Sequence, residues 1–186
     1  MATIKLSKNN FFHNLNIIKD KVGDINKIAV VLKDNAYGHG LIQIASLSKE
    51  FGIKNAIVKN LDEALQIGSF FDHILILGKV DFTTYSHPFH ITINSLSDVN
   101  KISQNSTVHI KVDTGMHRYG INDEENIIET IHSLQHHPTI DLKGIYTHFA
   151  TADNNEFFYL NQKERFESII DRLDIKPRVI HMSNSS

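Results

Sequence analysis

The chain has 186 residues, of which 41% are hydrophobic and 22% are charged, a composition typical of one globular domain. Its formal net charge of −2 offers no cationic surplus for nucleic acid, and the absence of Cys excludes disulfides and thiolate metal sites. No apolar run has the length of a signal-peptide core or a membrane span. We therefore expect a soluble, cytoplasmic protein with no nucleic-acid partner and no membrane partner.

Seven short apolar runs have the length and the β-branched composition of strands. They cover residues 28–32, 55–58, 74–77, 91–93, 108–112, 142–148 and 179–182. The intervals between the runs carry amphipathic stretches, and strands separated by single helices form right-handed parallel crossovers. The sequence therefore predicts a parallel α/β protein.

The predicted helices show apolar residues at helical spacing and a polar residue at the start. Their apolar stripes cover residues 11–22, 127–134 and 166–173, and a further helix is expected to begin near Leu41. Ser7 precedes the first stripe, and Asn122 precedes the second as its expected N-cap, with Glu125 three residues on. Asn60 and Glu63 have the same capping spacing, which predicts another helix start.

Two architectures fit this alternation, a doubly wound open sheet and a (β/α)8 barrel. The fifth predicted strand distinguishes them, because it is apolar on one face and polar on the other. The apolar face holds Val108, Ile110 and Val112, and the polar face holds His109, Lys111 and Asp113. An open parallel sheet buries apolar side chains on both faces, so the polar face favours a barrel interior. The sequence stops at the seventh strand, and we expect an incomplete TIM-type barrel with about seven of its eight strands.

Polar residues collect where four predicted strands end, the position of active sites in parallel barrels, and we expect them to converge on one rim. They occupy residues 33–40, 113–120, 147–153 and 181–185. Lys33 follows five apolar residues, whose low polarity favours the neutral amine that attacks carbonyl groups. A solvated surface lysine is the alternative. Tyr37 and the start of the next helix offer donors to an anion, unless the tyrosine merely packs over a glycine turn.

The loop after the fifth strand presents Arg118 between two glycines. Its guanidinium either pairs on the surface with Asp123 or Glu124, or binds a carboxylate or phenolate. Lys111 is expected to point to the barrel interior, where a buried ammonium needs a partner or must lose its charge.

Twelve histidines raise the question of a metal site. His132 and His136 are four residues apart on a predicted helix, but no third ligand is in register, and we expect no metal. His148 and His181 lie on predicted interior faces, where they are either hydrogen-bonded structural groups or participants in catalysis.

Four stretches together resemble motifs of the alanine racemase family. They are VLKDNAYGHG at residues 31–40, KVDTGMHRYG at 111–120, THFATAD at 147–153 and HMSNS at 181–185. Four motifs in the family's order are specific, whereas one match alone would be weak. The resemblance extends over residues 1–186, including 2–6, where the family begins with a short strand. It implies a barrel domain that binds pyridoxal phosphate, and a family fold completed by a C-terminal β domain that is absent here.

The resemblance implies a role for each matching residue. Lys33 would form an aldimine with pyridoxal phosphate and serve as one of two catalytic bases that interconvert L-alanine and D-alanine for peptidoglycan. Tyr37, Asn184 and Ser185 would bind the cofactor phosphate. Arg118 would contact the phenolic oxygen of the cofactor and hold the substrate carboxylate.

Three further residues match supporting positions of the family. His148 resembles the histidine beside the cofactor ring, and His181 resembles a residue of its supporting network. Lys111 matches a lysine that is often carbamylated, a modification that would turn a buried cation into an anion able to pair with Arg118. Two positions depart from the pattern, because Asp34 and His117 stand where small residues are common. A carboxylate at Asp34 would raise the pKa of its lysine neighbour.

The family forms homodimers, and its second base is a tyrosine from the partner's C-terminal domain. The five tyrosines of this chain all lie in the barrel part, so we expect the chain to hold only one of the two bases. Three alternatives remain open at this point. They are a racemase for another amino acid, a non-catalytic pyridoxal-phosphate-binding barrel without a β domain, and an inactive chain.

Overall fold

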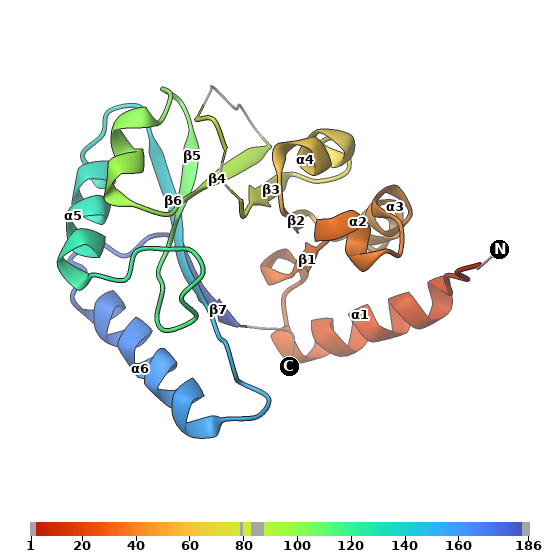
Figure 1. Ribbon diagram of the computed structural model, residues 1–186. Coiled ribbons are helices and arrows are strands. Elements are labelled where there is room, and N and C mark those ends of the chain that lie inside the picture. Colours follow the sequence, from red (N-terminus) through yellow and green to blue (C-terminus); the bar gives the residue numbers. More distant parts are fainter. Residues whose placement is uncertain (1–2, 79, 83–87, 184–186) are drawn as a thin grey trace. The chain divides into compact units, whose positions relative to one another are not determined.

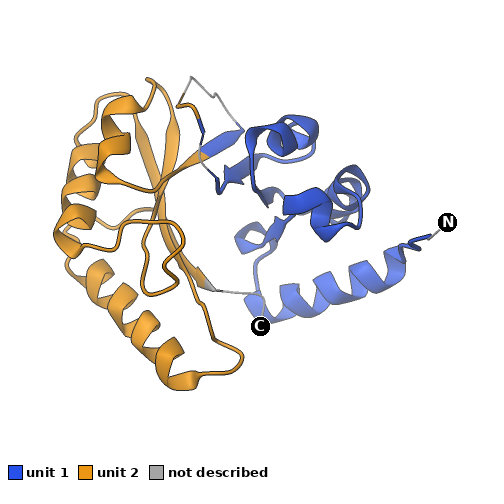
Figure 2. Cartoon of the chain, viewed as in Figure 1, with its two compact units in different colours: residues 1–80, 87–90 blue, residues 81–86, 91–186 orange. Residues whose placement is uncertain are grey.

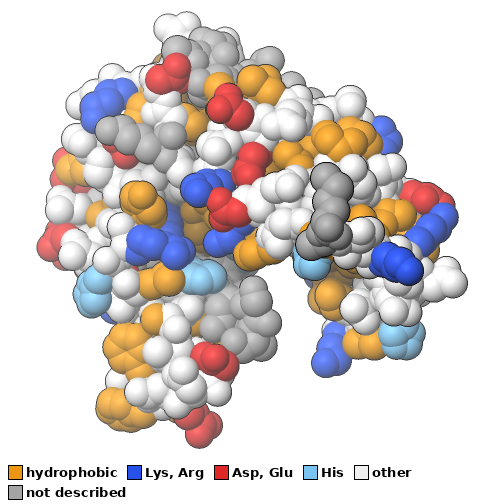
Figure 3. Space-filling view, turned by 45° about the vertical axis from the view of Figure 1, so that its right-hand side comes forward, with side chains coloured by type: hydrophobic (Ala, Val, Ile, Leu, Met, Phe, Trp, Pro, Cys, Tyr) orange, Lys and Arg blue, Asp and Glu red, His pale blue; other side chains and the backbone are white. Residues whose placement is uncertain are grey.

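A computed structural model describes residues 3–78, 80–82 and 88–183 (Figure 1). The chain divides into two compact units, residues 1–80 with 87–90 and residues 81–86 with 91–186 (Figure 2). In the space-filling view, charged side chains of both signs are interspersed rather than gathered by sign (Figure 3).

Unit 1 carries the first three strands and the helices that connect them. Its elements are α1 (Lys8–Val22), the 3-10 helix η1 (Ile25–Lys27), β1 (Ala29–Val31), α2 (Lys33–Tyr37), α3 (Leu41–Phe51), β2 (Asn55–Val58), α4 (Leu61–Ile67) and β3 (His73–Ile76). β2 pairs in parallel with both β1 and β3. Its inward residues, Ala56 and Val58, are almost fully buried, so β2 lies at the centre of this unit's core.

The helix starts of unit 1 follow the capping rules. The Ser7 hydroxyl accepts a hydrogen bond from the Asn10 amide, and the Asn60 side chain accepts one from the Glu63 amide at 2.9 Å. Both caps satisfy backbone donors that the first helical turn leaves without intrahelical partners. The predicted caps of α1 and α4 are therefore confirmed.

Unit 2 carries the later strands and two long helices. Its elements are η2 (Leu96–Lys101), β5 (Thr107–Lys111), α5 (Glu124–Gln135), β6 (Asp141–His148), α6 (Glu156–Asp171) and β7 (Val179–Ser183), while β4 (Phe89–Ile93) begins in unit 1 and ends in unit 2. β6 pairs in parallel with β5 and β7, and α5 and α6 lie on one face of these strands (Figure 1). Ile110, Ile145 and Phe166 are fully buried where strands and helices pack.

The strands are hydrogen-bonded in sequence order, β1-β2-β3-β4-β5-β6-β7. A doubly wound sheet reverses its strand order at a switch point, whereas a parallel barrel keeps sequence order. The order therefore confirms the incomplete barrel and excludes the open sheet. All seven predicted strands are present, each with bounds within two residues of the prediction.

Three details of the prediction are wrong. Residues 3–6 form no strand, and single α-helices do not fill every crossover. Between β3 and β4 the described residues, 77–78, 80–82 and 88, include no helix, and η2 is the helical segment between β4 and β5. The third detail is the cap of α5, which is Asp123 rather than Asn122. The Asp123 carboxylate accepts from the Asn126 amide at 2.8 Å, and the Asn122 carbonyl accepts from Arg165.

The shifted cap of α5 gives a test with adjacent residues. Asp123→Ala should lower the free energy of unfolding by about 1 kcal/mol, because it removes a charged cap at a helix N-terminus. Asn122→Ala should cost less than half as much, since its carbonyl is retained. Urea denaturation of both variants measures the difference, and equal losses would contradict the assignment of Asp123 as the cap.

Candidate functional site

Lys33 stands at the end of β1, directly after the buried side chain of Leu32. The four residues that follow it, Asp34 to Tyr37, all have positive φ values between 51° and 56°. They form one turn of left-handed helix, although none of them is glycine. Each such residue costs roughly 1–2 kcal/mol relative to a right-handed turn, so surrounding contacts must enforce the conformation.

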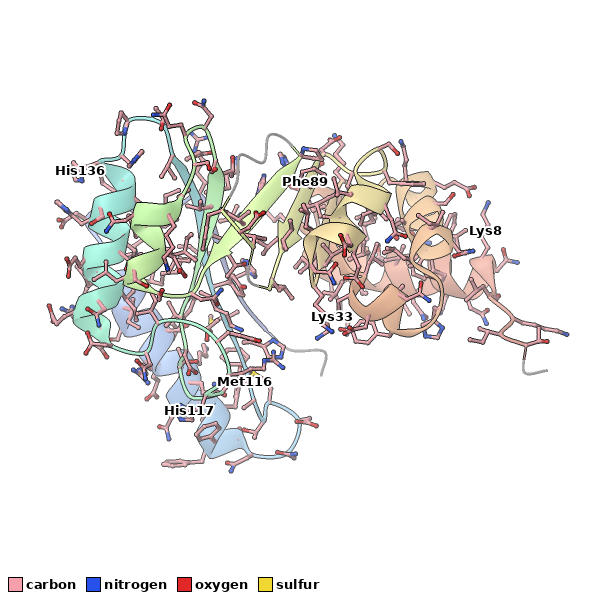
Figure 4. The ribbon with its side chains drawn as sticks, turned by 45° about the horizontal axis from the view of Figure 1, so that its top comes forward. Lys8, Lys33, Phe89, Met116, His117 and His136 are labelled. Atoms are coloured by element: carbon pink, nitrogen blue, oxygen red, sulfur yellow. The ribbon has the colours of Figure 1, made fainter. Side chains whose placement is uncertain are left out.

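The left-handed turn places Lys33 and Tyr37 together. The Lys33 ammonium lies 5.6 Å from the centre of the Tyr37 ring, and the Tyr37 side chain is 56% exposed. Lys33 is only partly buried and is labelled in Figure 4. An accessible amine beside an accessible phenol is a pair able to meet a small molecule that carries both a carbonyl and an anionic group.

The sequence predicted that the Asp34 carboxylate would act on its neighbour Lys33, but in the structure this carboxylate also has a second partner. Its carboxylate accepts a hydrogen bond from the Lys59 ammonium at 2.7 Å, which is also an ion pair. This hydrogen bond is the main reason that the pKa of Asp34 lies below its ordinary value, and the charges of Lys59 and Lys33 act in the same direction. The negative charge that follows Lys33 is thus shared with a second lysine.

In unit 2, Lys111 is buried, as its strand position predicted, with 6% of the residue exposed. Its ammonium lies 5.7 Å from the centre of the Tyr119 ring and 6.0 Å from that of Tyr146. Aromatic faces attract cations, and these two rings partly offset the cost of burying the charge.

A stack of polar rings continues inward from Lys111. The rings of Tyr146 and His181 lie parallel with their centres 4.7 Å apart, and His109 meets His181 edge to face at 6.1 Å. Thr92 Oγ1 lies 3.2 Å from the Tyr146 hydroxyl, within hydrogen-bond distance. His181 thus contacts both Tyr146 and His109 among the interior side chains of unit 2. The sequence had not singled out Thr92 or Tyr146 as site residues; Thr92 lies between two isoleucines on β4, and Tyr146 follows Ile145 on β6.

Burial dominates the electrostatics of this stack. Desolvation lowers the pKa of His181 from its ordinary 6.5 to about 4, so its ring is neutral at pH 7. Desolvation also raises the pKa of the Tyr146 hydroxyl well above its ordinary value, while Thr92 and the charge of Arg118 oppose that shift. Tyr146 therefore keeps its phenolic proton at physiological pH.

The Arg118 loop is held by Asp113, which is buried. The Asp113 carboxylate accepts hydrogen bonds from the amides of Gly115 and His117, each at 3.0 Å. His117, labelled with Met116 in Figure 4, has a φ of 53°, which explains why a glycine would suit its position. Arg118 itself is exposed.

The surface alternative for Arg118 is not supported by its proposed partners. Asp123 caps α5, and Glu124 pairs with Arg172 at 2.9 Å. The guanidinium of Arg118 is instead close enough to Tyr146 for its charge to affect that hydroxyl.

His148 is the last residue of β6 and is partly buried. Gln162, a buried residue of α6 that the sequence had not indicated, reaches this strand end. Its side chain accepts from the Ala150 amide at 2.9 Å and donates to Thr114 at 3.2 Å. Gln162 stands four residues before Phe166, on the apolar stripe of α6. A polar residue on a buried helix face is the sequence signal that could have indicated it.

The predicted site residues lie in both units, and two of them are not described. Asn184 and Ser185 lie outside the described residues. Lys33 and Tyr37 belong to unit 1, whereas Lys111, Arg118, His148 and His181 belong to unit 2, so a shared rim stays a prediction.

His132 lies in the last turn of α5, and His136 is the C-cap of that helix. The rings of His132 and His136 lie 4.2 Å apart. Among the described residues, no group of three or more His, Cys, Asp or Glu side chains could hold a metal ion. In the same part of the chain, no helix is long and apolar enough to cross a membrane.

The family model "Alanine racemase, N-terminal domain" matches residues 6–186. The chain belongs to the alanine racemase family. It is 39% identical over its whole length to the alanine racemase of Nitratiruptor sp. and 38% identical to that of Campylobacter concisus. In both cases it covers 57% of the relative, so the chain spans little more than half the length of these curated relatives.

Solved structures agree with this membership. Alanine racemase from Oenococcus oeni matches with a TM-score of 0.87 at 33% identity, over 96% of this chain and 55% of that one. Histidine racemase from Leuconostoc mesenteroides matches with a TM-score of 0.85 at 26% identity, over 95% of this chain and 51% of that one. The fold predicted from the motifs is that of the alanine racemase barrel.

The neutral His181 of this alanine racemase family chain predicts a pH dependence. Because folding lowers the pKa of His181, the contribution of the neutral ring to the free energy of unfolding is complete above pH 6.5. This contribution is lost as the pH falls through about 4. His181→Phe keeps a flat ring against Tyr146 without a titrating group. We expect the variant to lose less unfolding free energy than the parent between pH 7 and pH 4, by at most about 3 kcal/mol.

Chemical denaturation at several pH values measures this difference. His13→Phe, at an exposed position of α1, serves as the control and should follow the parent. A His181→Phe variant whose stability falls with pH as steeply as the parent's would contradict the burial of a neutral ring.

Proposed function

We propose that the chain provides the cofactor-binding barrel part of a pyridoxal-phosphate-dependent amino-acid racemase that interconverts L-alanine and D-alanine, supplying D-alanine for peptidoglycan. The observation that carries this proposal is Lys33 at the end of β1, next to the Tyr37 phenol, in a chain of the alanine racemase family. In this proposal the complete protein is a cytoplasmic homodimer.

The side chains present fit the chemistry of pyridoxal phosphate. That cofactor offers an aldehyde, a phenolic oxygen and a phosphate group. Lys33 supplies the amine for the aldehyde, and the Tyr37 hydroxyl supplies a donor for the phosphate, with Asn184 and Ser185 proposed for the same role. Arg118 supplies a cation for the phenolic oxygen and for the substrate carboxylate, since a guanidinium matches a carboxylate with two parallel donors.

When bound, pyridoxal phosphate stabilises negative charge that develops on the Cα of an attached amino acid. Lys33 then has two tasks. Its Nζ would hold the aldehyde of the cofactor, and when released by the substrate amino group the same atom would remove or return the Cα proton on its own face. Racemisation needs a second base on the opposite face, and Lys33 is the only one of the two that we assign.

In this proposal His148 and His181 hold neighbouring groups in place and do not transfer protons. We propose His148 beside the cofactor ring, with His181 in the network behind it. His181 is neutral at pH 7 and stacks on Tyr146, so its ring itself adds no positive charge to this network. Proton transfer at Cα is therefore assigned to Lys33 alone among these residues.

We also propose that Lys111 is carbamylated, by addition of its neutral amine to carbon dioxide with loss of one proton. The resulting anion would pair with Arg118 and remove the cost of a buried ammonium. The intact chain, kept in bicarbonate and measured by native mass spectrometry, should gain about 44 Da on Lys111. A Lys111→Arg variant should not gain this mass, and an unmodified Lys111 in the parent would contradict the proposal.

The central prediction concerns Lys33. Pyridoxal phosphate added to the chain, followed by borohydride, should leave a stable adduct on the peptide that contains Lys33. Lys33→Ala should show no such adduct and no near-visible absorbance band. Lys54→Ala, which removes an exposed lysine of the same unit, should behave as the parent. Adducts spread evenly over surface lysines would contradict a dedicated anchor.

One observation favours a second candidate substrate, because a histidine racemase shares the fold at a TM-score of 0.85. Incorporation of solvent deuterium at Cα separates the possibilities when L-alanine, D-alanine and both enantiomers of histidine are compared. Exchange of alanine supports the first proposal, and preferential exchange of histidine supports the second. Uptake of pyridoxal phosphate on Lys33 with no exchange of any amino acid would support a non-catalytic binding barrel.

A further inference from the structure

The left-handed turn after Lys33 is partly closed by its own backbone. The Gly38 amide donates to the Asp34 carbonyl at 3.1 Å, and the Gly40 amide donates to the Asn35 carbonyl at 3.0 Å. The Asn35 side chain also accepts from the Leu41 amide at 2.8 Å, which joins the turn to the start of α3. These bonds use the carbonyls and side chains of the turn, and the amide of Asn35 needs an acceptor from elsewhere.

Glu63, in the first turn of α4, supplies that acceptor. Its Oε1 accepts from the Asn35 amide at 3.2 Å, and its Oε2 accepts from the Lys59 amide at 2.9 Å. The two oxygens of one carboxylate thus connect the left-handed turn to the segment between β2 and α4. A carboxylate in a first helical turn is also favoured by the helix dipole.

The segment that Glu63 joins to the turn is itself fixed. The Gly78 amide donates to the Lys59 carbonyl at 2.8 Å, and a Cβ at Gly78 would collide with that carbonyl. The Lys59 side chain reaches back to Asp34, which gives a second connection between the same two segments. A turn anchored on this segment cannot relax freely toward ordinary backbone angles.

From this geometry we propose that Glu63 is a positioning residue of the cofactor site, which holds the Asn35 amide and thereby the left-handed turn that sets Tyr37 beside Lys33. The inference rests on the proposed function, because it assigns the turn to cofactor binding. Glu63 touches neither cofactor nor substrate in this assignment and acts through the backbone of the turn. Charged residues lie in both segments that it joins, with Asp34 next to Asn35 and ion-paired to Lys59, and Asp62 is its helix neighbour.

The test compares Glu63→Gln with Asp62→Asn, a control that removes the same charge from an exposed neighbour in the same helical turn. Glutamine keeps one acceptor but presents an amide group to the second backbone donor, which breaks one of the two connections. The dissociation constants of pyridoxal phosphate and of pyridoxal, which lacks the phosphate, are measured by absorbance for the parent and both variants.

We expect Glu63→Gln to weaken pyridoxal phosphate binding by about tenfold, the effect of one lost charged hydrogen bond. Binding of pyridoxal should weaken by no more than about threefold, because the Tyr37 contact to phosphate is the one misplaced. Asp62→Asn should change neither constant by more than about twofold. Equal losses for pyridoxal phosphate and pyridoxal would overturn the proposal, since a general loss of stability affects both alike.

Hydrogen exchange at the Asn35 amide tests the connection without any cofactor. Glu63→Gln should accelerate that exchange at least tenfold relative to the core amide of Val58, and an unchanged rate would overturn the proposal. Failure of the proposed function has a different signature. The parent would then bind no pyridoxal phosphate at Lys33, while the Asn35 amide would still respond to Glu63→Gln.

Discussion

The strained backbone of Asp34 to Tyr37 is the feature on which the other contacts around Lys33 in unit 1 depend. In a left-handed turn the Cβ atom of each L-residue comes too close to the following carbonyl oxygen, and four such residues would not keep this conformation in an isolated peptide. The fold keeps it through bonds from α3, α4 and the segment after β2, which come from different parts of the sequence. In return, the chain reverses within a few residues, and Tyr37 faces the lysine that precedes the turn.

Unit 2 meets a different constraint, the burial of polar groups without water. A lysine, a tyrosine and two histidines share the interior of its strands, and each charge there costs desolvation energy. Flat aromatic contacts attract the Lys111 cation, and burial lowers the pKa of His181 so that its ring stays neutral at pH 7. Tyr146 contributes to both, since it faces Lys111 and stacks on His181. The interior of these strands thus holds the charged side chain of Lys111 between the Tyr119 and Tyr146 rings, with the neutral His181 ring stacked on Tyr146.

The sequence predicted the features that depend on local pattern. Apolar runs located every strand, because burial on a parallel sheet leaves a strong compositional signal. The cap of α5 lies one residue after the predicted position, because Asn122 and Asp123 are both good caps and the local pattern does not distinguish them. The left-handed turn was beyond prediction, because its residues have no shared preference for positive φ. Glu63 was noticed only for its spacing from Asn60, and its bond to Asn35 joins positions 28 residues apart.

The two departures from the family pattern show how such a site accommodates change. His117 occupies a left-handed position, and the Asp113 carboxylate, which accepts from its amide, compensates for the missing glycine. Asp34 introduces a negative charge next to Lys33, and the Lys59 ammonium donates a hydrogen bond to its carboxylate. In each case the altered residue is met by a group already fixed by the backbone. The chemistry of Lys33 then depends less on the identity of its neighbour than on whether that neighbour's charge has a partner, which places Lys59 and Glu63 among the residues that a change of Asp34 would affect first.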